Sequence, residues 1–153
     1  MKKLKRGYTL IIFEILGKPV PQKQTQFFRG HAYDPSKKIK NMLQWQIASY
    51  APKEPLSGPI ILDIAFFFPI PASTSGVKRR QMLNGVLQHT IRPDIDNCAY
   101  LITNAMKKII YNDDSQIVEL YLHKRYGEIA KTCVKIVPYN YQALRGDSNE
   151  ASV

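Results

Sequence analysis

Residues 89–116 read HTIRPDIDNCAYLITNAMKKIIYNDDSQ, and this stretch places one pair of aspartates before an amphipathic segment and a second pair after it. The first pair is Asp94 and Asp96, and the second is Asp113 and Asp114. With Glu119 they concentrate acidic residues in a chain whose formal net charge is +10. Crowded carboxylates repel one another unless a cation neutralises them, so the spacing indicates a divalent metal site. Capping of a helix and formation of a turn explain the same residues equally well.

The segment between the two pairs has the pattern of a helix from about residue 97 to residue 109. Its apolar side chains recur at helical spacing and form one stripe, made of Cys98, Leu101, Ile102, Ala105, Met106 and Ile109. A helix of about 13 residues is roughly 20 Å long, which separates the two aspartate pairs within one chain. If two copies pair these helices antiparallel about a two-fold axis, each first pair approaches the partner's second pair. Two composite sites would result.

The neighbours of the aspartates complete two longer motifs. Before the helix stand Arg92, Pro93, Asp94, Asp96 and Asn97, and after it stand Asp113, Asp114, Gln116, Ile117 and Val118. This order resembles the signature of the RusA family of Holliday-junction resolvases, in which a basic residue and Pro-Asp-x-Asp-Asn precede a helix and Asp-Asp-x-Gln precedes a hydrophobic strand. Upstream, GKPVPQKQ at 17–24 and HAYDPSKKIKNMLQWQIA at 31–48 resemble the family's first turn and first basic helix.

The resemblance implies an α+β domain with a mixed sheet flanked by helices, a homodimer, and four-way junction DNA as the substrate. We expect Asp94, Asp96 and Asp114 to be catalytic and, with Asp113, to hold one or two Mg²⁺ ions for phosphodiester hydrolysis. Oxygen ligands without histidine favour Mg²⁺ or Mn²⁺ over zinc.

Several positions depart from the family pattern. Tyr100 stands where the family usually has a lysine that would stabilise the transition state, and Asn104 replaces a common aspartate. Gln22, Gln24 and Gln26 interrupt an upstream turn that is often rich in Lys and Arg. A non-catalytic protein that binds branched DNA and retains the resolvase fold is therefore the alternative hypothesis. An RNA-binding module is a third hypothesis, for which the sequence has no stacking motif.

The excess of 22 Lys and Arg over 12 Asp and Glu indicates a polyanionic partner, and charge alone leaves DNA, RNA and an acidic membrane open. The candidate DNA-binding residues are Lys18, Lys23, Arg29, Lys78, Arg79, Arg80, His89, Arg92, Lys107 and Lys108. An isolated histidine is more often structural, and a charge run such as residues 78–80 is usually a solvated face. Phe27 and Phe28 either stack on nucleic acid or, more commonly for such residues, pack beneath their loop.

Periodicity predicts the remaining elements of a single domain. They are a strand at 8–16, an irregular basic loop at 19–33, a helix at 36–50, a strand at 60–68, a short helix within 72–88, and strands at 116–124 and 130–137 joined by a turn around Gly127. Residues 1–140 form the expected domain, and residues 141–153 are expected to be a disordered tail.

The N-terminal sequence MKKLKRGYTLIIFEILG superficially resembles a signal peptide, but Glu14 interrupts its apolar run and no small-residue cleavage site follows. No stretch approaches the roughly 18 apolar residues of a membrane span. Cys98 and Cys133 match neither a CxxC pair nor a zinc pattern, which predicts free thiols in a reducing cytoplasm.

Overall fold

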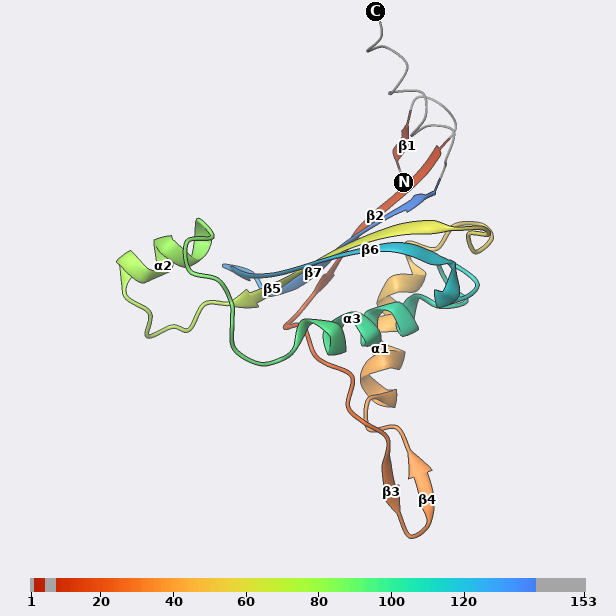
Figure 1. Ribbon diagram of the computed structural model, residues 1–153, viewed down its shortest axis with the longest axis horizontal. Helices are drawn as coiled ribbons and strands as arrows, with labels where there is room; N and C mark the ends of the chain where they lie inside the picture. Colours follow the sequence, from red (N-terminus) through yellow and green to blue (C-terminus); the bar gives the residue numbers. More distant parts are fainter. Residues whose placement is uncertain (1, 5–7, 140–153) are drawn as a thin grey trace, which may run out of the picture.

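The structure, a computed structural model, describes residues 2–4 and 8–139. Within them the chain forms a five-stranded sheet, a separate two-stranded hairpin and three α-helices (Figure 1). The elements are β1 (Lys2–Leu4), β2 (Tyr8–Leu16), β3 (Gln26–Phe28), β4 (His31–Tyr33), α1 (Lys37–Ala48), β5 (Ile60–Pro69), α2 (Gly76–Leu83), α3 (Ile95–Met106), the 3₁₀ turn η1 (Asp114–Gln116), β6 (Ile117–Gly127) and β7 (Lys131–Pro138).

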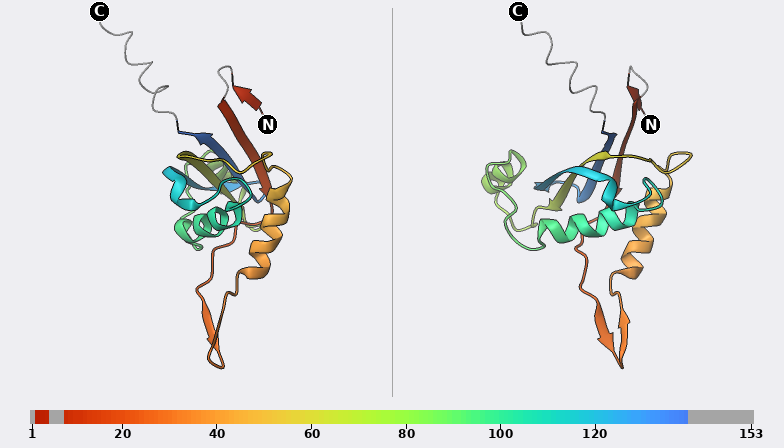
Figure 2. Two further views of the ribbon diagram at one scale, coloured as in Figure 1. Left: turned by 90° about the vertical axis from the view of Figure 1, so that its right-hand side faces the viewer. Right: turned by 45° about the vertical axis from the view of Figure 1, so that its right-hand side comes forward.

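The large sheet has the order β1-β2-β7-β5-β6, and only β5 and β6 run parallel. Side chains of a strand alternate between two faces, and in β5 every second residue is buried. These are Ile60, Leu62, Ile64, Phe66 and Phe68. They share one core with buried residues of α1 and α3. These two helices cover one face of the sheet, whereas no described helix covers the opposite face (Figures 1 and 2). The predicted α+β domain with a mixed sheet is thus confirmed.

The predicted amphipathic helix is α3, and its apolar stripe is buried in the core from Cys98 to Met106, whereas Ile109 lies beyond the helix and is partly buried. It begins two residues earlier and ends three residues earlier than the periodicity predicts. Asp94 is the extended residue before the first turn, and Lys107 leaves the helix with φ −57° and ψ 133°. Lys108 then adopts a left-handed conformation, with φ 66°. Because the backbone turns at these residues, Lys107 is directed toward the aspartates that follow.

The segment predicted as an irregular loop contains the β3–β4 hairpin, which extends away from the sheet (Figures 1 and 2). Its two central residues, Arg29 and Gly30, have φ of 48° and 80°, as a type I′ turn requires. Phe27 is 77% exposed and Phe28 is 65% exposed, so the expectation that they pack beneath the loop is wrong. The guanidinium of Arg29 lies 5.3 Å from the centre of the Phe28 ring.

The predicted turn around Gly127 links β6 to β7, although these strands are not neighbours because β5 lies between them. The link must therefore pass close to β5. A Cβ on Gly127 would lie 3.1 Å from the Cβ of Phe67. Only glycine fits this approach without a shift of the neighbouring chain.

No helix among the described residues is long and apolar enough to cross a membrane. The tail predicted at residues 141–153 lies outside the described residues. Cys98 and Cys133 are free thiols, as predicted, and burial is the main cause that raises the pKa of each to about 11. Both thiols therefore stay protonated at neutral pH.

Candidate active site

The first aspartate pair is exposed at the start of α3. Asp94 is the N-cap residue, yet its side chain makes no capping hydrogen bond, and Asp96 lies in the first turn. Among the described residues, neither carboxylate has an ion-pair partner within 4.0 Å or a side-chain hydrogen bond. Capping therefore does not account for this pair, and its oxygens remain available to a ligand.

Lys124 of β6 holds the segment that leads into α3. Its Nζ donates hydrogen bonds to the carbonyl oxygens of Ile91, at 2.6 Å, and Pro93, at 2.7 Å. No sequence motif marks this residue. A signal was present, because the strand alternation places Lys124 on the same face as Leu120 and Leu122, where a charged side chain needs partners. Lys124 therefore fixes the position of the backbone immediately before Asp94.

The second aspartate pair already has a cation in this chain. The Nζ of Lys107 lies 2.9 Å from Asp113 Oδ2 and 2.9 Å from Asp114 Oδ1. The hydrogen bond from the Ser115 backbone N–H, followed by that from Lys107, holds the pKa of Asp113 well below its usual range. The pair thus needs a neutralising charge, as its crowding predicts, and Lys107 supplies that charge within the chain.

Gln116 anchors the loop that carries this second pair. Its Oε1 accepts hydrogen bonds from the backbone N–H groups of Asn112 and Asp113, both at 2.8 Å. Its Nε2 donates to the carbonyl oxygens of Leu56, at 3.0 Å, and Gly58, at 2.8 Å. Asp113 also caps η1 by accepting from the Ser115 N–H at 3.0 Å. The capping interpretation therefore holds for Asp113, which combines a structural role with its charge.

The two pairs stay apart within one chain. The 12 residues of α3 span roughly 18 Å. Among the described residues, no three or more His, Cys, Asp or Glu side chains gather closely enough to hold a metal ion. Mg²⁺ commonly binds one or two carboxylates and completes its shell with water and phosphate oxygens, so each pair fits as a partial ligand set.

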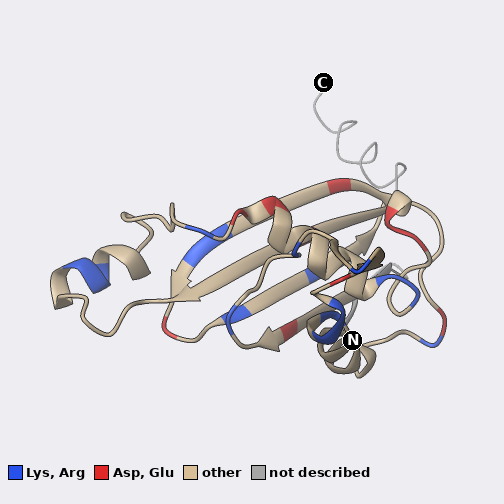
Figure 3. Cartoon of the chain, turned by 90° about the horizontal axis from the view of Figure 1, so that it is seen from below, with Lys and Arg blue, Asp and Glu red and all other residues tan. Residues whose placement is uncertain are grey.

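The candidate DNA-binding cations occupy several parts of the surface (Figure 3). Most are exposed, namely Lys18, Lys23, Arg29, Lys78, Arg80, Arg92 and Lys108. Arg79 of α2 pairs with Glu128 at 3.6 Å, and Lys107 is engaged by the second aspartate pair. The structure thus leaves seven of the ten candidates with open access to a polyanion.

His89 is buried, and this placement contradicts its expected role as a DNA contact. Its ring stacks on Phe68 at 4.2 Å between centroids and lies 4.8 Å from the ring of Tyr126. Only 7% of the residue is exposed, and its buried Nδ1 has no hydrogen-bond partner among the described residues. Burial, aided by the charge of Lys124, lowers the pKa of His89. The imidazole is therefore a neutral core group.

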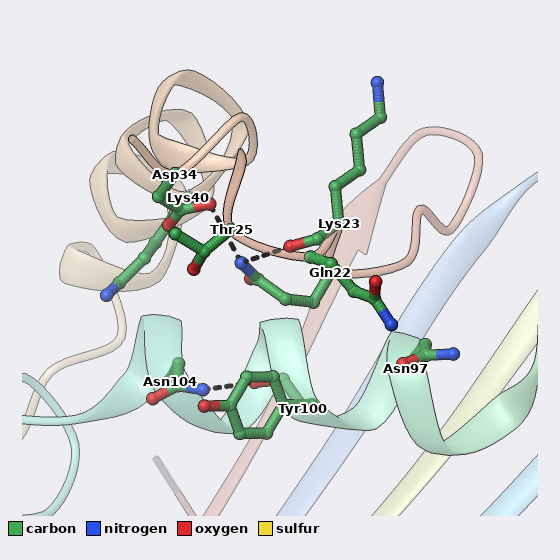
Figure 4. Close-up of a pocket in the computed structure, with 9 residues that line it drawn as sticks. Gln22, Lys23, Thr25, Asp34, Lys40, Asn97, Tyr100 and Asn104 are labelled. Atoms are coloured by element: carbon green, nitrogen blue, oxygen red, sulfur yellow. Dashed lines mark hydrogen bonds between the residues drawn. The ribbon is translucent and has the colours of Figure 1, made fainter. Parts of the chain in front are cut away.

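Tyr100 lies one helical turn after Asp96 and is 57% exposed. It lines a cleft of about 390 Å³ between α3 and residues 22–25 (Figure 4). The Gln22 backbone N–H donates to the Asn97 carbonyl oxygen at 2.9 Å and so joins the two walls. Tyr100, Asn104, Gln22 and Gln24, all of which depart from the sequence signature, share this one cleft.

Comparison with known proteins shows what this chain is similar to. The model of a family described as Endodeoxyribonuclease RusA matches residues 17–137. A Bacillus subtilis (strain 168) protein named "Uncharacterized protein YqaN" is 31% identical over 134 residues, which are 82% of this chain and 94% of the relative. The family match spans α1, α2, α3 and β5, and it includes both aspartate pairs and the cleft.

Proposed function

Since this chain belongs to the RusA family of endodeoxyribonucleases, we propose that it cuts four-way DNA junctions by Mg²⁺-assisted phosphodiester hydrolysis. The observation that carries the proposal is the exposed pair Asp94 and Asp96 at one end of α3, which has no ion-pair partner among the described residues, with Asp113 and Asp114 at the other end. Mn²⁺ can replace Mg²⁺, because both favour carboxylate oxygens.

The residues of the site have separate roles in the proposed reaction. Asp94 and Asp96 of one chain, with Asp114 and the assisting Asp113 of its partner, would hold the cation. The cation would supply activation of a water and stabilisation of the leaving 3′ oxygen. Lys124 keeps the backbone before Asp94 in place. Lys107 neutralises the second pair within the chain, and if Asp113 and Asp114 bound a cation instead, its ammonium would be free to contact a phosphate oxygen.

A homodimer would bring the separated pairs together. The contacts of Lys124 with the start of α3, and of Asp114 with Lys107 at its end, show that α3 runs opposite to β6. β6 is an outer strand of the sheet, and an outer strand can pair with another chain. Its exposed apolar side chains are Val118 at 53%, Leu120 at 44% and Tyr121 at 51%. Antiparallel pairing of two β6 strands about a two-fold axis would carry each first aspartate pair toward the partner's second pair.

The surface around these pairs suits a branched polyanion. Arg92 precedes the first pair and Lys108 precedes the second, while Arg29 lies at the tip of the hairpin. Phosphate contacts of this kind provide affinity without reading sequence, whereas the exposed Phe28 ring offers a surface for a base.

The test is a cleavage assay on labelled four-way junction, duplex DNA and single-stranded RNA, with and without Mg²⁺. We expect Asp96→Asn and Asp114→Asn to abolish junction cleavage while junction affinity is kept or improved, because each substitution removes negative charge near phosphate. Asp63→Asn, which changes a half-buried aspartate of β5 outside both pairs, is the matched control and should cleave as the parent does. Full cleavage by either active-site variant would refute the assignment.

The second candidate function is a non-catalytic protein that binds branched DNA. The replacement of the usual lysine by Tyr100 favours it, since a neutral phenol supplies no positive charge to the transition state. The same assay separates the two functions, because tight junction binding without cleavage under either Mg²⁺ or Mn²⁺ would identify the binding protein. Preferential binding of the single-stranded RNA would instead support an RNA-binding module.

A further inference from the structure

The cleft beside α3 has the chemistry of a site for an uncharged, planar, hydrogen-bonding ligand. Its volume of about 390 Å³ lies within the range of small-molecule pockets. The walls carry four side-chain amides, contributed by Gln22, Gln24, Asn97 and Asn104. Lys23 and Lys40 add positive charge, and Tyr100 adds an aromatic ring. A site that bound phosphate alone would need cations in place of these amides.

Hydrogen bonds within the walls hold the amide of Gln22 in a fixed orientation (Figure 4). Its Nε2 donates to the Lys23 carbonyl oxygen at 3.2 Å and to Asp34 Oδ1 at 3.0 Å, which uses both of its hydrogens. Asp34 Oδ1 is itself held by the Ser36 backbone N–H at 2.8 Å. The Oε1 of Gln22 is consequently the atom of this amide that can accept from a ligand.

The opposite wall is ordered in a similar way. Asn104 Nδ2 donates to the Tyr100 carbonyl oxygen at 2.9 Å, and this bond orients the Asn104 amide along the helix. The Tyr100 ring is more than half exposed on the cleft side of α3. Asp96 stands four residues earlier on the same helical face, where Cβ atoms are about 5–6 Å apart. A ligand on the Tyr100 ring would therefore lie beside the catalytic carboxylates.

We propose that this cleft takes an unpaired nucleobase of the junction, stacked on Tyr100 and hydrogen-bonded to Gln22 and Asn97. Unstacked bases are recognised by aromatic side chains and by polar groups along their edges. Lys23 and Lys40 would contact the flanking phosphates. The inference rests on the proposed function, and it gives Tyr100 a role in selecting the cleavage position rather than in the chemical step.

The experiment measures dissociation constants for four-way junctions without divalent metal, so that binding is separated from cleavage. An abasic nucleotide is placed in turn at each position around the crossover. Each junction is tested with the parent, Tyr100→Ala, Tyr100→Phe, Tyr100→Leu and Trp45→Ala. Trp45 is 81% exposed on α1 and lies outside the cleft, so its variant controls for the loss of an exposed aromatic residue. Thermal unfolding confirms that each variant is folded.

We expect one abasic position to weaken binding of the parent, Tyr100→Phe and Trp45→Ala about tenfold. Tyr100→Ala and Tyr100→Leu should bind intact junction about tenfold more weakly than the parent. An abasic nucleotide at that position should not weaken the binding of these two variants further, because the substitution and the abasic nucleotide remove the same contact. A tenfold change corresponds to about 1.4 kcal/mol, within the range of about 1–3 kcal/mol for stacking of one base.

The inference would be overturned if no abasic position weakened binding of the parent (a flat profile). It would also be overturned if, at every position, the loss of affinity from the abasic nucleotide added fully to the loss from Tyr100→Ala. Either result would leave phosphate contacts as the role of the cleft. If the parent cleaves junctions with Mg²⁺ but shows that flat profile, only this inference fails. If the parent neither binds nor cleaves junctions, the proposed function fails with it.

Discussion

At the scale of single residues, Lys124 and His89 show how the surroundings of a side chain decide its role. Both lie near the start of α3, and Lys124 contributes to the lowered pKa of His89. Lys124 donates to two backbone carbonyls, whereas His89 lies between aromatic rings without a partner for Nδ1 in the described part of the chain. The first residue positions the site, and the second stabilises the fold beneath it.

His89 makes the stability of the fold depend on pH. Burial first, and then Lys124, lowers its folded-state pKa below the unfolded value of about 6.5. The unfolded chain therefore binds a proton that the folded chain does not, so this stability is complete above about pH 6.5 and is lost as the pH falls below it. We expect the melting temperature of His89→Phe to fall less than that of the parent between pH 7.5 and 5.5. If the melting temperatures of the two proteins fell equally, the assignment of His89 as a neutral, buried imidazole would be contradicted.

Lys124 should affect catalysis more than DNA binding. Lys124→Met removes both hydrogen bonds to the segment before α3, so the Asp94 backbone loses its support. A displacement of about 1 Å in a catalytic group can reduce the rate about 100-fold. We expect a reduction of about that size in single-turnover junction cleavage, with junction affinity changed only a few-fold. Lys135→Met, which alters an exposed lysine of β7, is the control and should retain the parental rate.

At the scale of elements, the loop between α3 and β6 depends on one side chain. Gln116 makes four hydrogen bonds, two to the loop itself and two to the segment before β5. Partly exposed hydrogen bonds contribute about 0.5–1.5 kcal/mol each, so we expect Gln116→Leu to lower the free energy of unfolding by about 2 kcal/mol. Urea unfolding measures this change. Gln81→Leu, at an exposed position of α2, should change stability by less than about 0.5 kcal/mol.

The sequence predicts best the elements in which the spacing of apolar residues matches the residues that are buried. β2 has the predicted bounds, and β5 and α1 differ by only a few residues at their ends. The hairpin was missed because Arg29, rather than the usual Asn or Asp, stands before Gly30 at a positive φ. The early end of α3 was missed because Ile109 continues the apolar spacing beyond the point where the backbone leaves the helix.

Individual contacts of the candidate site were less predictable than its motifs. The carboxylate crowding predicts a neutralising cation, but spacing cannot show that Lys107 reaches Asp113 and Asp114 after leaving α3. The cleft around Tyr100 joins residues 22–25 to α3 across more than 70 positions of sequence, and its backbone link between Gln22 and Asn97 has no sequence signal.

At the scale of the whole molecule, the separation of the aspartate pairs is the reason for proposing that each site is shared between two chains. We expect a doubly substituted Asp94→Asn, Asp96→Asn subunit and an Asp114→Asn subunit to be inactive alone and to recover junction nicking when mixed. Each contributes the half that the other lacks, so one site per heterodimer is intact. Nicking of a labelled junction after subunit exchange measures the recovery.

The control for this experiment prevents the chains from pairing. Leu120→Lys places a charge on the exposed edge of β6, and like charges facing each other across paired strands are unfavourable. Mixed subunits that both carry it should remain monomeric in sedimentation and should not recover activity. Heterodimers that form but fail to nick would instead show that each site lies within one chain.

The β3–β4 hairpin has a consequence for how proteins of this kind diversify. Its strands pair with each other in a sheet separate from the main one, and all six of their residues are exposed. Mutations at its tip therefore cost the folded core little. Substitutions can change the charge of this arm, and insertions or deletions can change its length, without disturbing the aspartates and their supporting residues. If the hairpin contacts DNA as proposed, substrate affinity and the chemistry at the phosphate can therefore evolve at different rates within one small protein.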